Sequence, residues 1–287
     1  MPGTLYVVST PIGNLGDLTP RAAETFAQVG FVAAEDTRVT LRLLNHLGLK
    51  KPMLSYHKHS GPSRTAAILA RILAGEDCAL CSDAGTPAIS DPGEDIVADA
   101  LAQGIRVVPV PAASAAIAAL SVAGRSTGRF VFEGFLPQNK RQRRQRLADI
   151  AREERTVVLY EAPHKLPYAL ADLAEALGDE RALTICRELT KLHEEIWQTT
   201  LGEATRHYEE NAPKGEFVLV LAGRAPQEKT PAASLEEAVQ CARALVAGQQ
   251  LSASEAARRA AKQSGQAKSD IYRAMQTHGA AGPEEDR

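Results

Sequence analysis

This chain of 287 residues has no long apolar segment and little cysteine, and we expect no secretory leader. No apolar run approaches the roughly 18 residues that a membrane-spanning helix requires. The first residues, MPGTLYVVSTPIGN, contain neither the basic stretch nor the long apolar stretch of a signal peptide. Its four cysteines are too few for a disulfide framework. We therefore expect a protein of the cytoplasm, in a reducing compartment.

Several catalytic motifs are also missing. No G-x-G-x-x-G follows the first predicted strand, and neither G-x-x-x-x-G-K-[ST] nor H-E-x-x-H occurs, which argues against a dinucleotide site, a P-loop and a zincin. Cys78 and Cys81 form a C-x-x-C, but residues three apart in a strand point to opposite faces, so we interpret them as core residues. His57 and His59 have no third ligand nearby. We expect no metal.

The composition is that of an ordinary globular protein. Hydrophobic residues make up 44% of the chain and charged residues 24%, and the length suits about two domains. The formal net charge is only −2. Any binding to nucleic acid must therefore come from local basic patches.

Strand and helix patterns alternate over the first half of the chain. Strands are predicted at 4–9, 31–35, 78–82 and 105–110, and helices at 39–46 and 63–73. Thr19 and Pro20 predict the start of a helix that stops near Gly30. Asp91, Pro92 and Glu94 form a capping-box pattern for another, which ends at Gly104. The alternation predicts a mostly parallel sheet.

A second α/β unit is predicted from about Gly124. Its strands are expected at 129–133, 156–161, 182–188, 194–200 and 216–222. Leucines recur at the spacing of one helical face, at Leu166, Leu170, Leu173 and Leu177. No clear helical pattern precedes the turn between the last two strands, so we expect a mixed sheet.

The C-terminal residues predict a small helical module after a linker at 225–234. Ser252 and Glu255 form a capping box, Gly265 turns the chain, and a second helix carries Ile271 and Met275 on one face. This outline is that of a helix-turn-helix, but any helical hairpin produces it equally well.

Three loops of small residues follow predicted strands, at 11–14, 82–87 and 111–115. Ligands bind where strands end in open α/β sheets. Each loop alone is more simply interpreted as a tight turn, whereas the three in this order indicate a ligand site.

The longer motifs around these loops resemble the tetrapyrrole methylase superfamily, and within it the enzymes that methylate small-subunit ribosomal RNA. The resemblance covers about residues 4–223 plus the helical tail, and it is carried by TPIGNLGDLTPRA at 10–22, AAEDTR at 33–38, SDAGTPAISDPG at 82–93, EGFLP at 133–137, YEAPHKL at 160–166, RELTK at 187–191 and KGEFVLV at 214–220. It implies an α/β fold with two α/β domains, 1–122 and 123–224, around an inter-domain cleft, followed by a helical module at 235–287.

The resemblance also implies the ligand, the methyl donor S-adenosylmethionine. Its expected contacts are Pro11, Gly13, Ser82, Asp83, Thr86, Ser114, Ala115, Glu161 and Gly215. A sulfonium cation suits a cleft with an available carboxylate such as Asp83, although that residue could instead cap its own loop. The third loop departs from the family, because Ala112 and Ala113 stand where a Gly-Pro pair is expected.

A basic segment favours nucleic acid over a small tetrapyrrole as the acceptor. Residues 139–146 read NKRQRRQR and enter a predicted helix with Leu147 and Ile150 on its inner side. Its cations have no acid between them and suit phosphates, whereas a solvated helix face usually alternates in sign. They are Lys140, Arg141, Arg143, Arg144 and Arg146, and the tail adds Arg258, Arg259, Lys262, Lys268 and Arg273.

The activity implied by the resemblance is methylation of a ribose 2′-hydroxyl, on a cytidine of 16S ribosomal RNA in the decoding region of the small subunit, by a homodimeric enzyme. Candidates for the proton transfer are Glu188 and Lys191, with Arg38 or Asp36. A lysine acts as a base only if its surroundings lower its pKa. A structural ion-pair cluster is nearly as good an interpretation of these residues.

Two other functions stay open at this point. A porphyrinogen-type C-methyltransferase would methylate a tetrapyrrole and show no salt-sensitive RNA binding. A DNA-binding regulator would use the C-terminal helices and transfer no methyl group.

Overall fold

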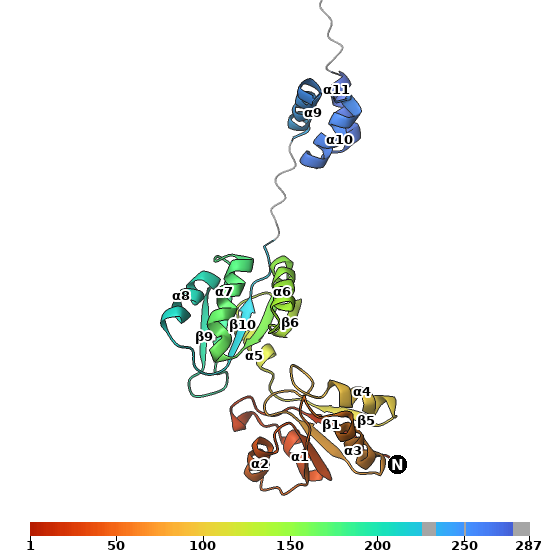
Figure 1. Ribbon diagram of the computed structural model, residues 1–287, viewed down its shortest axis with the longest axis vertical. Coiled ribbons are helices and arrows are strands. Elements are labelled where there is room, and N and C mark those ends of the chain that lie inside the picture. The colour runs from red at the N-terminus through yellow and green to blue at the C-terminus, as the bar shows by residue number, and fades with distance from the viewer. Residues whose placement is uncertain (226–233, 250, 278–287) are drawn as a thin grey trace, which may run out of the picture. The chain divides into compact units, whose positions relative to one another are not determined.

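The computed structural model describes residues 1–225, 234–249 and 251–277 (Figure 1). Residues 1–224 form one compact unit, and the described residues after Arg224 form a second. The first unit contains two sheets, each with its own helices, which we call the first and the second lobe. Among the described residues no helix is long and apolar enough to cross a membrane.

The first lobe is built on a fully parallel sheet of 5 strands in the order β3-β2-β4-β1-β5. Every residue of β2 and β4 is buried, because helices cover both faces of the sheet. The strands are β1 Thr4–Val8, β2 Phe31–Ala34, β3 Met53–Ser55, β4 Cys78–Cys81 and β5 Arg106–Val110. Sequence analysis found all of these except the short edge strand β3.

Helices cover the two faces of this sheet in pairs. One face packs against α3 and α4, and the other against α1 and α2. Cys78 belongs to the first of these cores and Cys81 to the second, which confirms that they point to opposite faces. The helices are α1 Pro20–Gln28, α2 Thr37–His46, α3 Pro62–Leu73 and α4 Glu94–Ala102, with a short 3₁₀ helix η1 at Leu15–Asp17.

One of the two predicted helix starts in this lobe is correct and the other is wrong. The Thr19 hydroxyl accepts a hydrogen bond from the backbone N–H of Ala22, as expected for the start of α1. The capping box at Asp91 does not form. Residues 88–92 close a tight loop, in which the Ala88 N–H donates to the Pro92 carbonyl, and α4 starts after Gly93, whose φ is +148°. The Asp91 side chain therefore does not cap α4.

The second lobe has a mixed sheet, as predicted. Its order is β6-β7-β10-β8-β9; the neighbours β6 and β7 pair in parallel, and the other neighbouring strands pair antiparallel. Helices α6, α7 and α8 pack on one face and α5 on the other. The elements are α5 Ala115–Val122, β6 Phe130–Phe135, α6 Lys140–Arg152, β7 Thr156–Glu161, η2 Pro163–Lys165, α7 Leu166–Leu177, β8 Ala182–Arg187, β9 Glu195–Thr200, α8 Leu201–Glu210 and β10 Phe217–Leu221.

Two helices of this lobe test the sequence patterns. Leu166, Leu170 and Leu173 of α7 are fully buried and Leu177 packs against them, which confirms the apolar face. Helix α8 was not predicted, although Thr200 caps it by accepting from the N–H of Glu203. Helix α5 follows β5 in sequence but packs against β7 and β10. The division into 1–122, 123–224 and 235–287 remains a proposal.

The described C-terminal residues form a three-helix module with its own small core. Its helices are α9 Leu235–Gln249, α10 Ala253–Ser264 and α11 Lys268–Thr277. Ser252 caps α10 and Gly265 ends it in the left-handed conformation, as predicted, whereas α9 was not expected. Most of the predicted linker at 225–234 lies outside the described residues.

Candidate functional site

A cavity of about 450 Å³ opens between the two lobes of the first unit, a volume typical of small-molecule sites. Its walls come largely from loops at the carboxyl ends of strands, where α/β sheets bind ligands. From the first lobe and the start of α5 the lining residues are Ile12, Ala84, Gly85, Thr86, Ile89, Ser90, Asp91, Ser114 and Ala115. From the rest of the second lobe they are Phe135, Tyr160, Glu161, Ala162, Pro163, His164, Cys186, Leu189, Glu216, Phe217 and Val218.

The three loops singled out in the sequence meet at this cavity. Thr10 and Gly85 exchange backbone hydrogen bonds of 2.9 and 3.1 Å, which ties the loop after β1 to the loop after β4. The third loop leads into α5, where the hydroxyl of Tyr160 accepts a hydrogen bond of 3.0 Å from the N–H of Ala116. Residues of all three loops therefore border one cavity, and binding of a ligand there stays a prediction.

The predicted donor contacts divide into two groups. Thr86, Ser114, Ala115 and Glu161 line the cavity. Pro11, Gly13, Ser82, Asp83 and Gly215 lie outside its lining. Ser82 is buried behind the wall, where its hydroxyl donates to the Ala84 carbonyl at 3.3 Å. Contact between the donor and the residues of either group stays a prediction.

Three carboxyl groups line the cavity, those of Asp91 and Glu161 and, on the rim, that of Glu216. Burial raises the pKa of Asp91 to about 6, and the nearby carboxylate of Glu35 adds to the effect. Burial also raises the pKa of Glu161, whose Oε1 accepts the N–H of Ala162 at 2.9 Å. Desolvation of this kind is relieved when a cation binds beside the carboxylate. The cavity is thus suited to a positively charged ligand.

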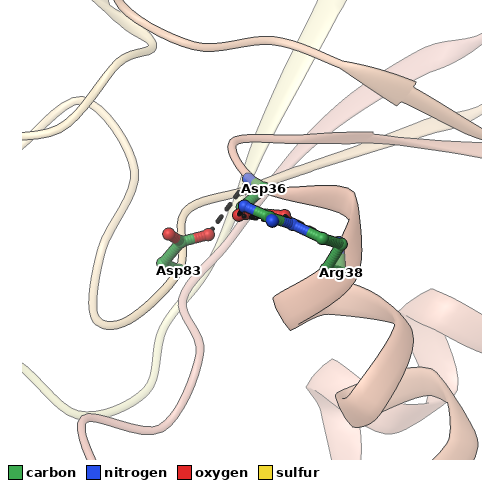
Figure 2. Close-up of polar contacts among 3 residues, drawn as sticks. All are labelled: Asp36, Arg38 and Asp83. Carbon is green, nitrogen blue, oxygen red and sulfur yellow. Dashed lines mark hydrogen bonds and ion pairs between the residues drawn. The ribbon is translucent and has the colours of Figure 1, made fainter.

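A cluster of charged residues lies beside the cavity on the first lobe, at the start of α2 (Figure 2). The Asp83 carboxylate accepts the N–H of Asp36 at 3.0 Å, and Arg38 forms an ion pair of 2.6 Å with Asp36. The hydrogen bonds from Arg38 lower the pKa of Asp36 to about 2. Asp83 therefore organises this turn, and Arg38, whose side chain is 87% exposed, does not line the cavity.

A lysine and two glutamates form a second charged cluster on the rim. Lys191 Nζ lies 2.8 Å from Glu188 Oε1 and 2.9 Å from Glu216 Oε2, and Glu216 lines the cavity. Burial lowers the pKa of Lys191, but its hydrogen bonds to both glutamates outweigh burial and the net shift is upward. The hydrogen bond from Lys191 lowers the pKa of Glu188. The pair is thus held as ammonium and carboxylate, which disfavours the Lys191 amine as a general base.

Two glycines that were predicted to contact the methyl donor leave the space that this cluster occupies. A Cβ on Gly13 would lie 2.6 Å from side-chain carbons of Lys191, and a Cβ on Gly215 would lie 2.5 Å from Glu188. Both glycines also have positive φ values, +150° and +92°. Any other residue at either position would push the ion pair out of its place.

The basic segment is the N-terminal half of α6, and its five cations are not equivalent. Arg143 pairs with Asp172 at 2.5 Å and Arg146 with Glu133 at 3.2 Å. Lys140, Arg141 and Arg144 are exposed and form no ion pair with any described residue. The surface available to a polyanion is therefore smaller than the sequence indicated.

Most residues of the cavity wall were not predicted individually, among them Ile89, Asp91, Phe135 and Tyr160. Asp91 had been interpreted as a helix cap. Phe135 and Tyr160 lie within the EGFLP and YEAPHKL motifs, so their motifs were noted but not their positions. Among the described residues no group of three or more His, Cys, Asp and Glu could hold a metal ion.

Comparison with known sequences gives one consistent set of relatives. The family model for Tetrapyrrole (Corrin/Porphyrin) Methylases matches residues 4–205. A relative from Synechocystis, named ribosomal RNA small subunit methyltransferase I, is 50% identical over 270 residues, which cover 94% of this chain and 96% of the relative. A relative of the same name from Xylella fastidiosa is 49% identical and covers 79% and 84%. One from Pseudomonas aeruginosa is 48% identical and covers 78% and 81%.

Solved structures show the same fold at much lower identity. Uroporphyrin III C-methyl transferase from Thermus thermophilus matches with a TM-score of 0.56 at 17% identity, over 77% of this chain and 97% of that one. A cobalt precorrin-4 methyltransferase matches with a TM-score of 0.59 at 15% identity, over 76% and 94%. Another structure of the Thermus enzyme holds S-adenyl homocysteine. The predicted fold class, two α/β lobes of the tetrapyrrole methylase type plus C-terminal helices, is confirmed.

Proposed function

The chain belongs to the tetrapyrrole methylase family, and we propose that it transfers a methyl group from S-adenosylmethionine to the ribose 2′-hydroxyl of a cytidine in 16S ribosomal RNA. Support for the general activity comes from the relatives, whose shared name describes methylation of small-subunit ribosomal RNA. The ribosomal substrate would place the reaction in the cytoplasm.

The cavity, with the carboxyl groups of Asp91 and Glu161 in its wall, is the observation that carries the proposal. The donor is a cation at its sulfonium centre and at its amino group, and Asp91 and Glu161 face the space that it would occupy. A carboxylate in a cavity of low polarity attracts a cation much more strongly than one in water. Apolar side chains of Ile12, Cys186 and Val218 complete the wall, as is usual for cofactor sites.

We assign the donor contacts in two layers. Direct contact is proposed for Thr86, Ser114, Ala115 and Glu161, with Asp91 added. Pro11, Gly13, Ser82, Asp83 and Gly215 would hold the loops and the ion pair around the donor. Ser9 supports Thr86 from behind, because their hydroxyl oxygens lie 3.0 Å apart.

The rim cluster provides the chemistry at the acceptor. The ribose 2′-oxygen attacks the methyl carbon in line, the new C–O bond forms as the S–C bond breaks, and the sulfur leaves as a neutral thioether. The Lys191 ammonium would stabilise negative charge on the attacking oxygen. Glu188 is a weak base, but the hydroxyl becomes strongly acidic as the new bond forms, so this carboxylate suffices to accept its proton. Arg38 would influence the methyl transfer only through its positive charge.

RNA binding is assigned to the basic half of α6. Lys140, Arg141 and Arg144 would contact phosphates directly, while Arg143 and Arg146 order the helix through their pairs with Asp172 and Glu133. The tail cations add a second basic surface. We further propose a homodimer, as the family resemblance implies, and light scattering on the purified chain tests it.

The decisive experiment supplies purified protein with radiolabelled S-adenosylmethionine and either small ribosomal subunits or naked 16S RNA, isolated from cells that lack this activity. Label should enter RNA and survive in an alkali-resistant dinucleotide, because a 2′-O-methyl group blocks cleavage at that ribose. Lys191→Met should slow transfer by about 100-fold or more, and Lys50→Met, at an exposed lysine before β3, should not change it. Label only in an added tetrapyrrole would support a C-methyltransferase instead.

A further inference from the structure

Two large apolar side chains are exposed where they line the cavity, one from each lobe. Phe135 at the end of β6 is 52% exposed, and Ile89 in the loop after β4 is 49% exposed. Single exposed apolar residues are common on protein surfaces. These two differ because the backbone that presents each of them is unusual.

A break in the strand pairing turns Phe135 toward the cavity. The register of β6 against β7 shifts between Phe132 and Gly134, which is a β-bulge at Glu133, and bulges re-aim the side chains that follow them. Gly134 has a φ of +61°, and a Cβ there would lie 2.7 Å from the Ser90 hydroxyl. The end of β6 thus touches the loop that carries Ile89, and only glycine fits at the contact.

Ile89 is presented by a strained loop. Its neighbours Ala88 and Ser90 have φ values of +69° and +64°, in the left-handed region that residues with side chains rarely adopt. The Ile89 N–H donates to the Thr86 carbonyl at 3.3 Å, so the loop is held in this form. Strain of this kind persists mainly at ligand sites.

The ring of Phe135 is held from one side only. Tyr160 contacts it edge to face with ring centroids 5.7 Å apart, and Tyr160 is itself anchored by the N–H of Ala116. About half of the phenyl surface is left open to solvent. A supported aromatic ring with an open surface is what stacks on a planar ligand.

The chain continues from Phe135 directly into the basic helix. Lys140 follows five residues later and opens α6, whose exposed cations suit RNA phosphates. An aromatic ring next to a basic surface is the usual arrangement for holding an unstacked nucleotide. The nearness of these features along the chain indicates that they bind neighbouring parts of one RNA strand.

We infer that Phe135 stacks on the nucleobase of the target nucleotide, with Ile89 bordering the same entrance from the first lobe. The inference rests on the proposed function. For its ribose to reach a methyl group inside the cavity, the nucleotide must leave its helical stack and lose the stacking energy. A new stacking partner at the entrance would replace that lost contact and place the 2′-hydroxyl above the donor.

The test uses the full-length protein and compares Phe135→Ala with Phe135→Tyr, which keeps a stacking ring. Tyr168→Ala is the matched control, since Tyr168 is a 74% exposed aromatic on α7 outside the cavity lining. Two quantities are measured for each, the dissociation constant for S-adenosylmethionine by calorimetry and kcat/KM for the ribosomal substrate. A parallel substrate, a subunit reconstituted with an abasic target nucleotide, removes the base itself.

Phe135→Ala should lower kcat/KM by roughly 5- to 150-fold, the range for loss of one base-stacking contact. The dissociation constant of Phe135→Ala for S-adenosylmethionine should stay unchanged, and kcat/KM of Phe135→Tyr should stay near that of wild type. On the abasic substrate, wild type and Phe135→Ala should have the same kcat/KM. A matching loss of donor affinity would assign Phe135 to the donor and overturn the inference. So would unchanged kinetics, or an unchanged penalty on the abasic substrate. Wild-type protein that binds the donor but methylates no RNA would refute the proposed function itself.

Discussion

Replacement of Asp91 by asparagine should stabilise the ligand-free protein while weakening its affinity for the donor. Burial raises the pKa of Asp91 from its ordinary 3.8 to about 6, because the ionised carboxylate loses its water. Because Asp91 is only half-buried and solvent screens part of the effect, the ionised form destabilises the folded state by about 1–2 kcal/mol. Asparagine has nearly the same shape and carries no charge.

The sign of the effect depends on pH in a defined way. Above about pH 6 the folded carboxyl is ionised and the cost is complete. Between pH 6 and 3.8 the folded group is protonated while the unfolded one is still ionised, so the cost shrinks as the pH falls. Below pH 3.8 both states are neutral and the cost is gone. Asp91→Asn should therefore be more stable than wild type by about 1–2 kcal/mol at pH 7.5, with little difference near pH 4.

Urea unfolding at both pH values, without ligand, measures this difference. Asp99→Asn, an exposed carboxylate on α4, is the matched control and should change stability by less than about 0.5 kcal/mol. Calorimetry should show S-adenosylmethionine binding about 10- to 150-fold weaker in Asp91→Asn, the value of one charged contact. A variant that is less stable at pH 7.5, or equally stabilised at both pH values, would contradict the reasoning.

Three further predictions concern the rim, the basic helix and the core. Lys191→Met keeps the packing against Gly13 but removes the charge. Single-turnover methyl transfer should therefore slow by about 100-fold or more, while the affinity for S-adenosylmethionine stays within about twofold of wild type. An unchanged rate would exclude a catalytic role for Lys191. Neutralising Lys140, Arg141 and Arg144 together should reduce the slope of log affinity for RNA against log salt concentration by about 2 to 3, measured by filter binding. Leu170→Ala, at a fully buried position, should cost about 2–5 kcal/mol in urea unfolding, and a smaller loss would mean that the α7 core relaxes into the space.

Much of the local structure could be predicted because it depends on residues close together in sequence. The leucines of α7 define one face by their spacing alone, and the hydroxyls of Thr19 and Ser252 meet N–H groups only three residues away. Loops of small residues after strands could be recognised in the same way. Such contacts are available to the chain before the rest of the fold is in place, so the sequence pattern determines them.

The roles of individual charges could not be predicted because their partners are distant in sequence. A capping-box pattern is present in the sequence at residues 91–94. In the structure Gly93 packs against Ala88, so the helix begins after Gly93 and Asp91 faces the cavity instead. Arg143 was predicted to contact phosphate, but in the structure it pairs with Asp172, which is 29 residues away in the chain. Lys191 is kept protonated in part by Glu216, 25 residues away.

The sequence by itself thus determined the alternation of strands and helices, the helix faces and the loops at the strand ends, since hydrophobic periodicity and capping act over a few residues. Only the tertiary structure decided which charges are buried, which are paired and which face the cavity. The physical reason is that desolvation and ion pairing depend on what surrounds a group in space, and two sheets far apart in the chain supply those surroundings here.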